Sequence, residues 1–264
     1  MTMFITISIV IAATIVLFCC IYIAKHPNTS SSKRPSPLKR KQSHENDNMN
    51  CNKYMFSAKY IKTNRMHRDH IVYIFNDEDV RQRIEDLGYT DPIEFYNVDF
   101  PIPSEAQLDY LHDLMQAPVP DHICSRDAGA LIDFYLYEDD EANQELFEYA
   151  TEMHIPVSYY CRDKKLYNTI FYNLALRDKI AFFIFSVYKY KYHSHLYTPW
   201  GCQYEFLFYE FADIHQENKR FITSMNRYDG ADLQFFGIRN GCEGGSKATI
   251  AYKTALEFLK QNID

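Results

Sequence analysis

The chain has 264 residues, of which 47% are hydrophobic and 24% are charged, and its formal net charge is −7. An acidic chain is a poor general binder of nucleic acid, because phosphate contacts need clustered Lys and Arg. The seven cysteines are an odd number without a C-x-x-C pair, as expected of a compartment in which thiols stay reduced.

The first predicted element is a transmembrane helix over residues 4–24, an uncharged apolar run long enough to cross a bilayer. It lacks a basic start and an A-x-A exit, which favours an anchor over a cleaved signal peptide. Because the flanking basic residues all follow it, the pattern predicts an external N-terminus and a cytoplasmic C-terminal domain at the inner or plasma membrane. Near the cytoplasmic end, Cys19 and Cys20 are either acylation sites or small apolar helix residues.

Residues 25–52 are predicted to form a disordered basic linker, since they are rich in Pro and Ser and bury little apolar surface. The linker is interpreted as a topology determinant and a solvated spacer, whose cations could also contact anionic lipid. The predicted membrane-surface residues are Lys33, Arg34, Lys39, Arg40 and Lys41. The remaining domain, 53–264, is long enough for one sizeable core or for two small ones divided near 139–160.

Within this domain, the β-branched and aromatic run 71–75 predicts a short buried strand. A helix is expected from Asp77, with Ile84 on its apolar face and Gly88 as a left-handed C-cap. Residues 89–103 contain Pro92, Pro101 and Pro103 and are expected to be extended or looped.

Two further helices are predicted by their start signals. Ser104 and Gln107 have the spacing of a capping box, and Ser125 is the expected N-cap of the next helix. The segments PSEAQLDYLHDLM and SRDAGALIDFY then give a two-helix unit over 104–138. This unit resembles a short accessory module of some bacterial DNA-processing and phage-related proteins. The resemblance implies a helical hairpin and brings no catalytic residue, and the acidic domain argues against extending DNA binding to this chain.

From Asp139 onward the pattern predicts aromatic-rich helices, at about 140–153, 203–221 and 246–262. The nine-residue apolar stretch 180–188 is too short to cross a bilayer and predicts a buried helix or strand. The expected fold class is mainly α, an α+β fold with a small β element, made of one transmembrane helix and a cytoplasmic helical domain. The 22 Tyr and 19 Phe are expected to fill an ordinary core rather than an aromatic binding surface.

Two motifs are compared with metal sites. His193 and His195 form an H-x-H pair that Cys202 or His215 could complete as a zinc site, although the spacing matches no known zinc pattern. Acid-x-lysine pairs, which form half of some nuclease sites, occur at 163–165 and 217–219, as often as chance predicts. No cofactor or catalytic motif is found, so neither a cofactor nor a catalytic residue is predicted.

The glycine-rich segment 237–247 is the main candidate site, because it opens the predicted last helix, where free amides and the helix dipole favour an anion. The alternative is a flexible turn with Ser246 as N-cap. Just upstream, Asp229 and Asp232 form a polar loop of the kind that carries binding residues. The predicted anion-binding residues are Arg227, Arg239, Gly244, Gly245, Ser246 and Lys247.

The sequence therefore predicts a single-span membrane protein whose cytoplasmic domain binds a protein partner at the inner leaflet, without enzymatic activity. One alternative is an enzyme acting on a phosphate-bearing substrate, with Arg227, Arg239 and Lys247 as anion clamp. The other is a nucleic-acid-processing accessory protein. An enzyme would need a pocket that contains carboxylates with shifted pKa values. A binding module would need an exposed aromatic patch, and a nucleic-acid binder would need a basic groove.

Overall fold

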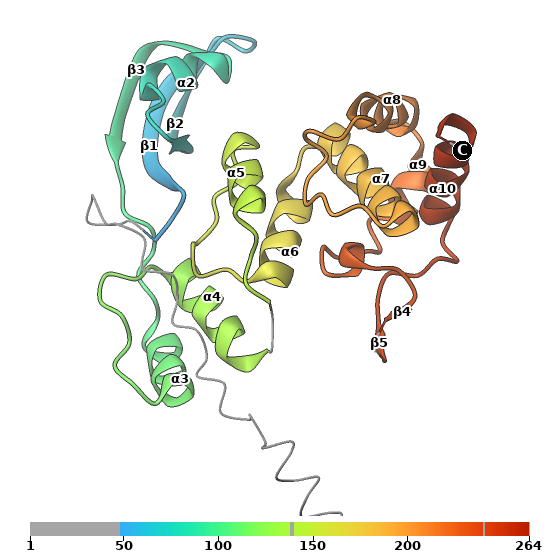
Figure 1. Ribbon diagram of the computed structural model, residues 1–264. Coiled ribbons are helices and arrows are strands. Elements are labelled where there is room, and N and C mark those ends of the chain that lie inside the picture. Colours follow the sequence, from blue (N-terminus) through green and yellow to red (C-terminus); the bar gives the residue numbers. More distant parts are fainter. Residues whose placement is uncertain (1–47, 138–139, 240, 264) are drawn as a thin grey trace, which may run out of the picture. The chain divides into compact units, whose positions relative to one another are not determined.

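The computed structural model describes residues 48–137, 140–239 and 241–263, except for the side chains of Arg239 and Cys242 (Figure 1). All these residues belong to one compact unit. They begin with a small antiparallel sheet and continue as a series of helices, so the described fold is α+β. Residues 48–52, predicted to end the linker, are part of this fold, because the first strand starts at Cys51.

The predicted membrane-spanning fold, the single-pass membrane class and the membrane localisation are corrected by the structure. Along the described residues, no helix is both long enough and apolar enough to cross a bilayer. The predicted span 4–24, with Cys19 and Cys20, and the linker cations up to Lys41 lie outside the described residues. The expected class, mainly α with one transmembrane helix, is therefore replaced by an α+β fold with a three-stranded sheet.

The sheet consists of β1 (Cys51–Tyr60), β2 (Arg65–Phe75) and β3 (Tyr89–Asn97), in the order β2-β1-β3. In the central strand, Phe56 lies opposite His70 of β2 and Phe95 of β3. One face of the sheet buries Phe56, Ala58, Val72 and Ile74 against Ile84 of α2 (Val80–Asp86). This alternation is the usual pattern of a sheet covered on one side.

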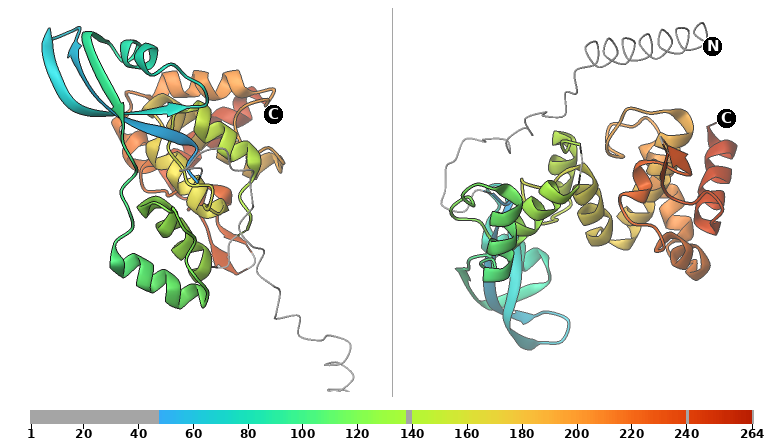
Figure 2. Two further views of the ribbon diagram at one scale, coloured as in Figure 1. Left: turned by 90° about the vertical axis from the view of Figure 1, so that its left-hand side faces the viewer. Right: turned by 90° about the horizontal axis from the view of Figure 1, so that it is seen from below.

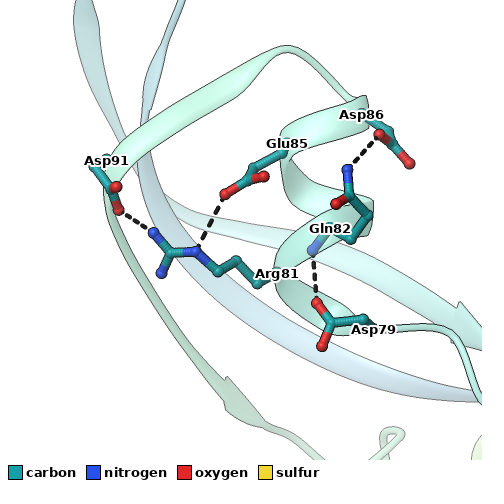
Figure 3. Close-up of polar contacts among 6 residues, drawn as sticks. All are labelled: Asp79, Arg81, Gln82, Glu85, Asp86 and Asp91. Carbon is teal, nitrogen blue, oxygen red and sulfur yellow. Dashed lines mark hydrogen bonds and ion pairs between the residues drawn. The ribbon is translucent and has the colours of Figure 1, made fainter.

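Polar contacts stabilise the start of helix α2 and connect the helix to β3 (Figure 3). The Asp79 side chain caps its start by accepting a hydrogen bond from the Gln82 amide at 2.8 Å. Arg81 donates to Glu85 at 3.1 Å and also pairs with Asp91 of β3, which joins the helix to the edge strand. Gly88 follows the helix with a φ of +88°, which confirms the predicted left-handed position.

Buried Asn50 joins the start of β1 to the loop that follows α5 (Gln144–Glu152). Its side-chain amide donates to the Ile155 carbonyl at 3.0 Å and to Thr151 Oγ1 at 3.2 Å, and its carbonyl oxygen accepts from the Val157 amide at 2.8 Å. The side chain therefore satisfies backbone groups that have no access to water.

Replacing Asn50 with alanine is expected to lower the free energy of unfolding by about 3 kcal/mol, since buried donors and acceptors left unpaired cost about 1–3 kcal/mol each. Urea denaturation measures the loss. Exposed Asn52 is the matched control, and its alanine variant is expected to stay within about 0.5 kcal/mol of the parent. Equal stabilities for the two variants would contradict the role given to Asn50.

Helices α3 (Glu105–Met115) and α4 (Ser125–Leu136) pack side by side through Leu111, Ile123, Ala128 and Leu131 (Figure 2). The capping box of Ser104 and Gln107 is confirmed. The N-cap of α4 is Cys124 rather than Ser125. The Cys124 amide donates to buried Asp127 at 2.8 Å, and Ser158 also donates to this carboxylate at 2.6 Å.

The larger core surrounds α7 (Leu176–Tyr192), in which residues 180–187 are all buried. The stretch 180–188 is thus a helix rather than a strand. Helices that contact α7 are α6 (Asp163–Asn173), α8 (Glu205–His215) and α10 (Ile250–Asn262), together with the short 3₁₀ helix η1 (Asp232–Gln234). The aromatic rings gather mainly here, in the core.

Several predicted helix boundaries are wrong: the helix expected from Asp77 begins at Val80, and the one expected from about residue 140 begins at Gln144. The helix expected over 203–221 is divided into α8 and α9 (Lys219–Met225), because Asn218 caps a new start by accepting from the Phe221 amide at 3.1 Å. The last helix begins at Ile250, with Thr249 as its N-cap, rather than at Ser246. The residues between η1 and α10 instead contain the short hairpin β4 (Ile238–Arg239) and β5 (Cys242–Glu243).

Candidate functional site

A cavity of about 450 Å³ opens between α9 and the start of α10, two helices that lie side by side (Figure 1). Its walls come from α9, from the residues just after it, and from the turn that caps α10. The lining residues are Lys219, Arg220, Thr223, Ser224, Arg227, Ala248, Thr249 and Ile250.

Three of these residues are cations. Lys219, Arg220 and Arg227 are all exposed, and within the described part of the chain none of them forms an ion pair. No acidic side chain of the described part of the chain lines the cavity. The three positive charges are therefore not neutralised locally, although the whole chain carries −7. Such a concentration of one sign of charge in a concave surface attracts ions of the opposite sign.

The N-terminus of α10 adds to this positive potential. Thr249 accepts a hydrogen bond from the Tyr252 amide at 3.1 Å, and Ser224 accepts one from the Ala251 amide at 3.0 Å. The Ile250 amide has no hydrogen-bond partner among the described residues, and Ile250 is one of the residues that line the cavity. The cavity therefore combines three cations, one free amide and the positive end of a helix dipole.

The glycines of the predicted anion loop have a different role. The Gly244 amide donates to the Gly237 carbonyl at 2.7 Å, and the Gly245 amide donates to the carbonyls of Phe235 at 3.1 Å and Asp232 at 3.2 Å. Neither amide is thus available to an anion. A Cβ on Gly244 would lie 2.4 Å from the Phe235 ring. These glycines permit close packing rather than ligand contact.

The other predicted anion residues are dispersed. Lys247 donates to the Tyr190 hydroxyl at 3.2 Å and lies over the Tyr190 ring, and Ser246 accepts from the Ala248 amide at 3.2 Å. Arg239 belongs to β4, and its side chain is outside the described part. Of the predicted set, only Arg227 lines the cavity.

The prediction from the sequence did not include three residues that line the cavity, Lys219, Arg220 and Thr249. The stretch from Lys219 to Arg227 contains three basic residues and no acid, and this was the available signal. This run of basic residues did not by itself predict the cavity, because α10, which completes the cavity, follows only after the β4–β5 hairpin.

The predicted polar loop is a local turn. The Asp232 amide donates to the Asp229 carboxylate at 2.7 Å, and the Asp229 amide donates to the Asp232 carboxylate at 3.2 Å. Burial raises the pKa of Asp232, although the hydrogen bond from the Asp229 amide opposes the shift. These carboxylates stabilise the turn and do not line the basic cavity.

Asp229 instead lines a second cavity of about 450 Å³, with charged residues of α4 and α6. There Lys165 pairs with Asp133 at 2.9 Å, and Arg162 lies 3.6 Å from Glu141 and over the Phe134 ring. Because these cations are already paired, the second cavity is less suited to binding an anion than the first cavity is.

The described residues contain no group of three or more His, Cys, Asp or Glu side chains placed to hold a metal ion. His193 and His195 are exposed, whereas Cys202 is buried. His215 packs against the Phe211 and Phe221 rings, and burial lowers its pKa. Among the described residues, neither Cys202 nor His215 is therefore placed to complete a zinc site with His193 and His195.

The acid-x-lysine pairs and the buried thiols show no catalytic arrangement. Asp163 accepts a hydrogen bond from Gln234 at the start of α6, while Glu217 is exposed and its companion Lys219 lines the basic cavity. Burial raises the pKa of Cys51 and of Cys161 to about 12. A thiol with so high a pKa stays protonated near neutral pH and is a poor nucleophile.

No family model, curated protein or solved structure matches this chain. The resemblance of residues 104–138 to an accessory module stays a prediction, as does the role it implies. What can be inferred about function therefore depends on the basic cavity between α9 and α10.

Proposed function

We propose that this protein is a non-enzymatic binding module that recognises a phosphate-bearing ligand in the basic cavity between α9 and α10. The proposal rests on one observation, the three cations without ion pairs that line this cavity beside the free Ile250 amide. The two arginines supply planar forks of donors suited to phosphate oxygens, and Lys219 adds a point charge.

The lining favours binding over catalysis. Among the described residues of this cavity there is no carboxylate, imidazole or thiol, the groups most often used as general bases or nucleophiles. The Thr223 hydroxyl can donate to a phosphate oxygen, whereas the Thr249 hydroxyl already contacts the Tyr228 hydroxyl and the Tyr252 amide. The alternative of an enzyme acting on a phosphate-bearing substrate has less support, because this cavity lacks the perturbed carboxylates such an enzyme would need.

The expected result of replacing Arg227 with alanine is at least a tenfold rise in the dissociation constant for pyrophosphate, about 1.4 kcal/mol of binding free energy. Loss of a guanidinium removes both charge and bidentate geometry. Isothermal titration of the full chain with pyrophosphate measures the change, and Arg227→Lys, which keeps the charge alone, is expected to give an intermediate constant.

Lys260 in the last turn of α10 is the charge-matched control, because it is exposed and lies outside the cavity lining. Lys260→Ala is expected to bind pyrophosphate as the parent does. Since the cations are exposed, the parent affinity is also expected to fall with added salt. Absence of binding by the parent, or equal losses in Arg227→Ala and Lys260→Ala, would refute the proposed site.

A further inference from the structure

A second basic surface lies far from the first in the sequence, on the hairpin of β1 and β2. The hairpin carries four cations, Lys59, Lys62, Arg65 and Arg68, and Asp69 is the single acid between Lys59 and His70. Within the described residues none of these cations forms an ion pair. The acidic charge of the whole chain therefore conceals a locally basic hairpin.

Beside these cations lies a cluster of aromatic and imidazole rings, defined here as Tyr60, His67 and His70 of the hairpin together with Tyr89 of β3. His67 and His70 are stacked, with centroids 5.0 Å apart and an interplanar angle of 28°. Tyr60 lies 5.3 Å from His67 and 5.1 Å from Tyr89. The Tyr89 hydroxyl is also 3.3 Å from Nδ1 of His67, which fixes the rings relative to one another.

This ring cluster is accessible. His70 is exposed, and the other three rings are partly exposed. On the same face of the sheet, α2 buries the residues nearer the base of the hairpin, where Val72 and Ile74 contact Ile84. The cluster therefore continues the apolar face of the sheet as a row of rings open to solvent.

The register places cations on both sides of these rings. Arg65 lies opposite Tyr60, and its neighbour Met66 lies opposite Lys59. Since side chains alternate along a strand, Arg65 shares a face with Tyr60 and Lys59 points to the other face. Lys62 lies in the turn that joins β1 to β2, at the tip of the hairpin. A chain crossing the hairpin would meet rings on one face and positive charges along its edge and tip.

We propose that the β1–β2 hairpin is a binding surface for single-stranded nucleic acid. Unpaired bases would stack on the exposed rings, and the cations of the edge strand and the turn, Lys62, Arg65 and Arg68, would contact the phosphates. These are the two kinds of contact used by non-sequence-specific binders of single strands. A duplex keeps its bases paired and would use the cations alone. An acidic peptide would likewise leave the rings without a role.

Fluorescence anisotropy of the full chain with a labelled oligothymidylate of 20 nucleotides tests the proposal. The expected result is tighter binding of the single strand than of a duplex of equal length. Arg65→Ala with Arg68→Ala is expected to weaken binding at least tenfold. It should also reduce the slope of log K against log salt by about 0.7 for each phosphate that the variant no longer neutralises. His70→Ala should weaken binding without changing that slope.

One control separates this surface from other basic sites. Lys253→Ala with Lys260→Ala removes two charges from α10 and is not expected to change oligonucleotide affinity. Near-UV circular dichroism of each variant establishes that it is folded. The proposal is overturned if the parent fails to bind at low salt, as it would if the cations only prevent pairing of the edge strand. Equal affinity for duplex, or tighter binding of an oligoglutamate peptide, would overturn it as well.

Discussion

Replacing Gly230 with alanine is expected to destabilise the protein by about 4 kcal/mol or more, at the upper end of what single substitutions do. A Cβ on Gly230 would lie 2.2 Å from the carbonyl carbon and oxygen of Tyr167 and 2.3 Å from the Asn168 nitrogen. These are backbone atoms inside α6, so they cannot move aside as a flexible side chain can. The turn before η1 would have to separate from α6. Urea denaturation followed by circular dichroism measures the loss.

Gly129 provides the matched control for this substitution. It lies in the middle of α4, and a Cβ there meets no atom within 4 Å. Alanine at a helical glycine is expected to stabilise by about 0.5–1 kcal/mol, since glycine loses more backbone freedom on folding. The two Gly→Ala variants should thus move in opposite directions. A Gly230→Ala protein as stable as the parent would show that the close approach to α6 is not required.

Replacing Phe183 with alanine is expected to cost about 3–5 kcal/mol, the range found for large aromatic residues in cores. Phe183 is completely buried in α7, and its ring lies 5.2 Å from Tyr228, 6.1 Å from Phe221 and 6.4 Å from Phe236. The substitution removes one ring shared by several elements, and a close-packed interior fills the resulting cavity only in part. Thermal and urea unfolding both measure the effect.

Phe206 in α8 is the control for Phe183, because its side chain is 65% exposed. Phe206→Ala is expected to change stability by no more than about 0.5 kcal/mol, as is usual for surface positions. If the two alanine variants lost equal stability, α7 would not be the centre of the core.

Local signals in the sequence predicted one helix start and one helix end correctly, and they predicted the strands less well. Ser104 with Gln107, and Gly88, act through neighbouring backbone groups, so their roles follow from a few adjacent residues. Strand β1 was missed, and β3 was predicted only as part of an extended or looped segment, because the stability of both strands comes from pairing with distant residues. β3 also contains Pro92 and is mostly exposed, so it lacks the alternation by which a strand is identified.

The lining of the candidate cavity was predicted only in part, for a similar reason. Of the predicted anion-binding residues, Arg227 lines this cavity, whereas the glycine amides expected to bind the anion already donate to nearby carbonyls. The basic cavity depends on α9 and α10 meeting across an intervening segment, and no short motif encodes this contact. The same holds for the β1–β2 hairpin, whose positive charge was hidden in the acidic total.

The hydrogen bonds of Asn50 also restrict when this protein can fold during its synthesis. Asn50 and Ile155 are 105 positions apart, so β1 leaves the ribosome well before its partner loop exists. At about 5–20 residues per second, translation imposes a delay of several seconds or more. During this time the start of the sheet lacks its permanent neighbours, and its junction with the helices closes only after α5 has emerged.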